Sequence, residues 1–81
     1  MKFTGNIMRN GQVVARGLAV NMRFQGKHWS GEIPLPKGST IYSGGFELVL
    51  NDGRKGKITL SVGPPTAQEA IAYFEGDGEL K

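Results

Sequence analysis

Apolar and polar residues alternate along most of this chain, which is the pattern of strands that bury one face. From 18 to 24 the even-numbered side chains are large and apolar, and from 29 to 35 the odd-numbered positions form the apolar face. The same alternation runs through 46–50 and 58–62. Successive side chains of a strand point to opposite faces, so each segment offers one wall to a common core. The pattern therefore predicts an all-β protein.

Turn residues separate these segments at short intervals. Asn10-Gly11 is a strong hairpin signal between 3–9 and 12–24, and Gln25-Gly26-Lys27 turns the chain into the Trp29 segment. The chain has 13 Gly in 81 residues, which suits tight corners and bulges. We predict a single domain over 1–81, a small, antiparallel, partly open β-barrel of five or six strands, similar in size to SH3 or OB domains.

The alternation also predicts the core and one irregularity. Arg16 has the same parity as the inward Leu18, yet a buried arginine there has no evident partner. A bulge at Gly17 would turn Arg16 outward and bend this long strand. The predicted core is Phe3, Ile7, Leu18, Val20, Met22, Phe24, Trp29, Ile33, Phe46, Leu48, Ile58, Leu60 and Val62.

The hairpin GFELVLNDGRKGKITLSV carries the most basic stretch of the chain. A two-residue turn at Asp52-Gly53 would place lysines opposite leucines on the apolar face, which is costly. A three-residue loop, 51–53, instead opposes Leu50 to Arg54 and leaves both Lys55 and Lys57 on the outer face. Gly53 then supplies the left-handed residue that this loop needs. We predict this second register, with Arg54 at the rim of the inner face.

The segment that follows Pro64-Pro65 allows two structures. Thr66 to Glu69 matches a helix capping box, which would give one short helical turn near 66–72. The run from Ile71 to Phe74 equally suits a strand, and a barrel needs a closing strand, whereas so short a helix is marginal alone. We favour a strand over 70–76.

A longer pattern covers about half of the chain, from Tyr42 to Leu80. Its residues are Gly44, Phe46, Leu48, Leu50, Asp52, Gly53, Arg54, Gly56 and Ile58, then Phe74, Gly76, Gly78 and Leu80, with Trp29-Ser30-Gly31 upstream. This pattern resembles that of small uncharacterised bacterial β-barrel proteins. The resemblance implies an antiparallel barrel of six or so strands with Phe74 in the last one. It implies no activity and transfers no functional residue.

The charge and composition limit location and partners. Residues 1–57 contain nine Lys and Arg against three acids, and 58–81 contain one against four, within a total of +3. This asymmetry fits either a basic face for an anionic partner or two ends that attract each other. There is no Cys, no leader-like apolar segment and no run long enough to span a membrane. We expect a cytoplasmic protein with no membrane association.

Few residues suit catalysis or metal binding. The only histidine is His28, the chain has no Cys, and no acid is evident beside His28. A nucleophile needs both a base and an orienting group. Glu75, Asp77 and Glu79 lack the spacing of a calcium loop. The stretch from Gly53 to Lys57 lacks the full phosphate-loop motif. We expect no enzymatic activity, no cofactor and no metal site.

The remaining function classes involve binding. We predict a small protein-interaction module, with contact residues Arg54, Lys55, Lys57, Tyr42 and Tyr73. The partner is expected to be another protein or a second copy of the chain, joined through an edge strand. The alternative is RNA or single-stranded DNA on a basic face, because small barrels bind such strands with cations and exposed aromatic rings. That alternative requires an exposed aromatic beside the basic residues.

Overall fold

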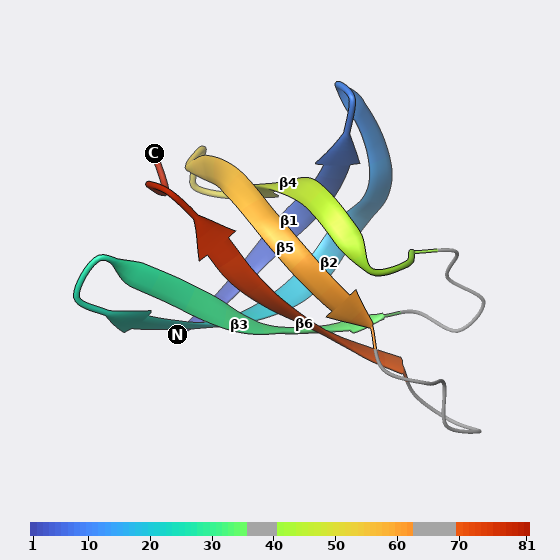
Figure 1. Ribbon diagram of the computed structural model, residues 1–81. Helices are drawn as coiled ribbons and strands as arrows, with labels where there is room; N and C mark the ends of the chain where they lie inside the picture. The colour runs from blue at the N-terminus through green and yellow to red at the C-terminus, as the bar shows by residue number, and fades with distance from the viewer. Residues whose placement is uncertain (36–40, 63–69) are drawn as a thin grey trace.

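Six antiparallel strands form a closed barrel (Figure 1). The computed structural model describes residues 1–35, 41–62 and 70–81. The strands are β1 (Lys2–Arg9), β2 (Gln12–Gln25), β3 (His28–Leu35), β4 (Gly44–Leu50), β5 (Lys55–Val62) and β6 (Ala70–Asp77). The all-β prediction is confirmed. The expectation of a partly open barrel is wrong, because β1 also pairs with β4 and completes the ring.

The barrel consists of two three-stranded meanders that meet along both of their sides. β1–β2–β3 and β4–β5–β6 are each joined by sequential antiparallel pairing. β1 then pairs with β4, and β3 pairs with β6, so each junction links equivalent strands of the two meanders. The favoured strand over 70–76 is confirmed as β6. The helical alternative is wrong over 70–72, and 66–69 lie outside the described residues.

A bulge at Gly17 interrupts the pairing of β2 with β1. Gly5 opposes Leu18 whereas Ile7 opposes Ala15, so β2 has one extra residue between these pairs. Gly17 has a φ of 63°, a left-handed value that glycine adopts without penalty, and its N–H donates to Asn6 Oδ1 at 3.0 Å. Arg16 is exposed, as predicted. After the bulge β2 still pairs with β1 as far as Asn21, and it pairs with β3 from Asn21 to Gln25.

The predicted three-residue loop of the basic hairpin is confirmed. Phe46 opposes Ile58 and Glu47 opposes Lys57. Leu50 N–H donates to the Arg54 carbonyl at 2.8 Å, which closes the loop in the expected register. Gly53 has a φ of 94°, a value strongly disfavoured for residues with a Cβ.

Within the described residues no polar or charged side chain is buried, so the inner face of the barrel is apolar there. Ten of the predicted core residues are buried, and Phe3 and Val62 are partly buried. The prediction for Phe24 is wrong, because its side chain is 42% exposed. Phe24 opposes the buried Trp29 and so faces inward, but it lies near the end of β2, at one open end of the barrel. The core also contains Leu35, Leu50, Ala72 and Phe74.

Trp29 occupies a slot that glycines leave open. A Cβ on Gly76 would overlap the indole ring, and a Cβ on Gly56 would lie 2.8 Å from it. Trp29 Nε1–H donates to the Gly78 carbonyl at 2.9 Å, which brings the end of the chain across the ring. Phe74, implied to lie in the last strand, is buried in β6 beside Trp29. Two glycines of the longer pattern, Gly56 and Gly76, therefore make room for one large core side chain.

Candidate interaction surfaces

Arg54 lies at one open end of the barrel, where it covers two aromatic rings. Its guanidinium carbon is 5.2 Å from the ring centre of Phe3 and 5.9 Å from that of Phe24, within cation–π range. Its Nε–H donates to Asp52 Oδ2 at 2.8 Å, and its backbone N–H donates to Asp52 Oδ1 at 3.0 Å. We call Phe3, Phe24, Asp52 and Arg54 the Arg54 mouth. The predicted rim position of Arg54 is confirmed.

The local contacts of Asp52 keep its carboxylate charged. The pKa of Asp52 lies below its ordinary value, chiefly because the Arg54 backbone N–H donates to it and also because the guanidinium is beside it. The Arg54 side chain is 39% exposed. The Arg54 mouth therefore presents a partly exposed guanidinium, fixed by Asp52, above two rings. Phe24 is the more exposed of these rings.

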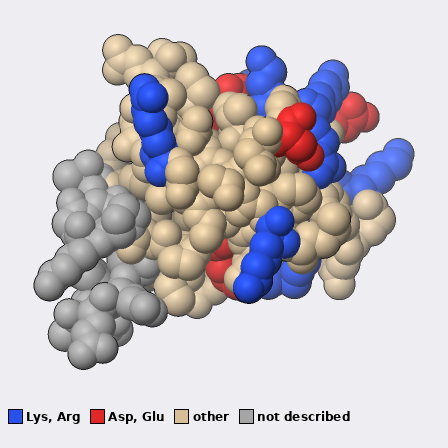
Figure 2. All heavy atoms as spheres, turned by 180° about the vertical axis from the view of Figure 1, so that it is seen from behind, with Lys and Arg blue, Asp and Glu red and all other residues tan. Residues whose placement is uncertain are grey.

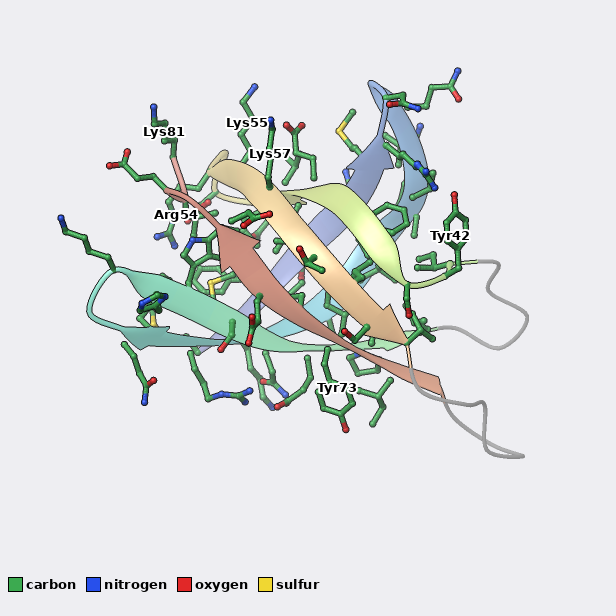
Figure 3. The ribbon with its side chains drawn as sticks, in the orientation of Figure 1. Tyr42, Arg54, Lys55, Lys57, Tyr73 and Lys81 are labelled. Atoms are coloured by element: carbon green, nitrogen blue, oxygen red, sulfur yellow. The ribbon has the colours of Figure 1, made fainter. Side chains whose placement is uncertain are left out.

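Lys55 and Lys57 extend from the outer face of β5, near the same end (Figure 3). Lys55 forms two backbone hydrogen bonds with Lys81. The two lysine side chains therefore extend from neighbouring backbone positions. Lys57 is opposed by Glu47 on β4 and by Asp77 on β6, two acids on the same face. Lys57 is thus flanked by negative charge, whereas Lys55 is flanked by a further cation.

Tyr42 is remote from this basic group, at the opposite end of the barrel (Figure 3). It is 55% exposed and packs edge-on against Phe46, with ring centres 5.8 Å apart. The guanidinium of Arg9 lies 5.0 Å from the centre of the Tyr42 ring. A small cavity of about 80 Å³ opens here, and we call its lining the Tyr42 pocket: Arg9, Val14, Ile41, Tyr42 and Phe46.

Tyr73 lies on a third surface, the outer face of β6 (Figure 3). It is 53% exposed and is opposed by Ser61 on β5 and Glu32 on β3. Glu32 in turn accepts a hydrogen bond from Arg23. The five predicted contact residues therefore do not form one site. Arg54, Lys55 and Lys57 are brought together, and each tyrosine lies elsewhere.

Two contributors to these surfaces were not predicted as contact residues. Alternation along β2 predicts Phe24 in the core. Arg9 is one of the nine basic residues of 1–57, and the sequence does not distinguish it from the others. A sequence signal for Phe24 did exist, since it is the last apolar residue before the turn at Gly26 and Lys27. No local signal placed Arg9 on Tyr42, because 33 positions separate them and only the β1–β4 junction brings them together.

Residues with catalytic or ligating groups are dispersed. His28 is exposed at the start of β3. Within 1–35, 41–62 and 70–81, no three His, Asp or Glu side chains are grouped to hold a metal ion. In the same part of the chain, no helix has the length and apolar character needed to cross a bilayer.

Comparison with known proteins gives no relative: no family model, no curated protein and no solved structure matches this chain. Membership of a family, which the hairpin and the C-terminal pattern suggested by resemblance, therefore stays a prediction. Its implied fold, a six-stranded antiparallel barrel, agrees with the structure.

Proposed function

We propose that this protein is a small non-enzymatic interaction module that binds a protein partner at the Tyr42 pocket. The observation that carries the proposal is the stack of Arg9 on Tyr42 and Phe46 beside a cavity whose lining is otherwise apolar. Tyr and Arg are enriched among residues that dominate binding energy, since both offer large contact area together with a polar group. Val14 adds an apolar contact that is 46% exposed.

The pocket size and charge indicate the kind of segment that fits. A cavity of about 80 Å³ accommodates one aliphatic side chain rather than a folded surface. Arg9 is exposed and carries a positive charge at the pocket edge. The partner we propose is an extended peptide segment with one aliphatic anchor and a neighbouring acidic residue.

Backbone geometry beside the pocket supports an extended partner. The first half of β2, which includes Val14, pairs with β1, and the ladder with β3 covers only Asn21 to Gln25. On its other side, the first half of β2 has no backbone pairing among the described strands. Bulges at Val14 and Gly17 interrupt its repeat, which disfavours a long continuous edge-to-edge dimer. Homodimerisation through an edge strand remains a prediction that sedimentation of the purified chain would check.

A peptide-display selection tests the proposal. Random 12-residue peptides would be selected on the wild-type protein, and binding would be remeasured on Tyr42→Ala. The matched control is Tyr73→Ala, which removes an equally exposed tyrosine from another surface. Selected peptides should lose about tenfold or more in affinity on Tyr42→Ala, the usual loss at a binding hot spot, and be unchanged on the control. Selection of no peptide, or peptides insensitive to Tyr42→Ala, would refute the proposal.

A further inference from the structure

The end of the barrel opposite the Tyr42 pocket combines cations with an exposed ring. Lys and Arg side chains are numerous toward the end away from the grey residues (Figure 2). Arg54 lies over the Phe3 ring, and Lys2 precedes Phe3 at the start of β1. Lys27 lies in the turn after Phe24, and Lys55 and Lys81 are joined by backbone hydrogen bonds. Asp52 and Glu79 are acids of this end, and Glu47 and Asp77 oppose the neighbouring Lys57.

We propose that this end, the Arg54 mouth with Lys2, Lys27, Lys55 and Lys81, binds single-stranded nucleic acid. Binding of a single strand requires cations along its backbone and aromatic rings on which bases stack. Phe24 is an aromatic ring that is 42% exposed within this cationic group. Tyr42 and Tyr73 have more exposed rings, but they lie on other surfaces. The inference is independent of the Tyr42 pocket.

The mouth suits a single strand better than a duplex. In a duplex the base faces are stacked on one another, and only the phosphates and groove edges are available. The apolar rings of Phe3 and Phe24 have no hydrogen-bonding group with which to read a groove edge. Arg54 is held by Asp52 above both rings, so a base that stacks against Phe24 meets an already positioned guanidinium.

Fluorescence anisotropy with labelled ten-nucleotide oligothymidine and oligouridine tests this inference. A duplex of the same length and a labelled ten-residue poly-aspartate are the control ligands. Wild-type protein should bind the single strands more tightly than either control. If about three phosphates are contacted, affinity should fall about 20-fold between about 50 and 200 mM salt.

Variants separate stacking from charge. Phe24→Ala should weaken oligonucleotide binding by about 5- to 100-fold, the loss expected for one stacked base, and leave poly-aspartate binding unchanged. Phe24→Leu keeps an apolar side chain and should show the same loss if Phe24→Ala proves unstable. Lys55→Gln with Lys81→Gln should weaken both ligands, and Tyr73→Ala should weaken neither.

Two results would overturn the inference. Absence of oligonucleotide binding at about 50 mM salt, where charge contacts are strong, would exclude the site. Equal weakening of oligonucleotide and poly-aspartate by Phe24→Ala would show that the mouth is a general anion surface, as an acidic protein segment would require. Neither result bears on the peptide selection at the Tyr42 pocket, so the two proposals fail separately.

Discussion

Replacing Gly76 with alanine should push the barrel's only tryptophan out of place. A Cβ at this position would overlap the indole, and its three nearest atoms would all belong to the Trp29 ring. Carbon atoms in packed interiors approach to about 3.5–4.0 Å, so the ring would have to move by more than an ångström. Trp29 is 4% exposed and is tethered to the Gly78 carbonyl, so it cannot move freely.

The expected loss in the free energy of unfolding follows from the contacts that Trp29 would lose. Overpacking a filled core costs about 1–3 kcal/mol, and loss of the Trp29–Gly78 hydrogen bond adds about 1 kcal/mol. The lower entropy of alanine in the unfolded chain returns about 0.4–1 kcal/mol. We expect Gly76→Ala to lower the free energy of unfolding by about 2–3 kcal/mol, or about 10–20 °C in Tm. Gly56→Ala, with a contact of 2.8 Å, should cost less.

A double-mutant cycle identifies the cause of this loss. Urea unfolding would be followed by far-ultraviolet circular dichroism in wild type, Gly76→Ala, Trp29→Leu and the double variant. If the clash is with the indole alone, Gly76→Ala should be nearly neutral in the Trp29→Leu background. An equal cost in both backgrounds would refute the reasoning.

Gly31→Ala is the matched control for this cycle. A Cβ there would overlap the backbone carbonyl of Asn21 and lie 2.9 Å from the Phe74 ring. Truncation of a side chain cannot move a backbone carbonyl on the neighbouring strand. Phe74→Leu should therefore fail to rescue Gly31→Ala, in contrast to the rescue expected at Gly76.

Two further predictions concern the bulge and the mouth. Gly17→Ala should cost about 1 kcal/mol in urea unfolding, because a left-handed φ penalises a Cβ, and Gly17→Asn should cost less; equal costs would contradict this account. The pKa of Asp52 is lowered by folding, so its carboxylate stabilises the fold above its ordinary pKa, and that contribution disappears as pH falls through the lowered value. In a carboxyl NMR titration, Arg54→Gln should raise the pKa of Asp52 only in part, because the backbone N–H remains, and an unchanged pKa would contradict the assignment.

The pattern of glycines that runs through the hairpin and the chain end has a structural explanation. Gly53 serves the loop, while Gly56 and Gly76 leave room for Trp29. Gly78 has a φ of 88° and accepts the indole hydrogen bond. The placement of these glycines therefore reflects how a small barrel encloses a large side chain.

Residues close in the sequence determined the local features of this protein. The strands, the loop 51–53 and the bulge at Gly17 follow from alternation, from turn glycines and from the cost of burying Arg16. The rim position of Arg54 follows from the same register, since it depends only on the residues that oppose Leu50 and Phe46.

Tertiary structure alone decided the closure of the barrel and the grouping of its surface residues. Alternation states which face of a strand is apolar, but it does not state where along the strand the barrel ends. Phe24 is exposed for that reason, although it has the parity of the buried Met22. The stacking of Arg9 on Tyr42 depends on the β1–β4 junction, and the β3–β6 junction places Glu32 opposite Tyr73. These junctions join residues far apart in the chain, and no local pattern encodes them.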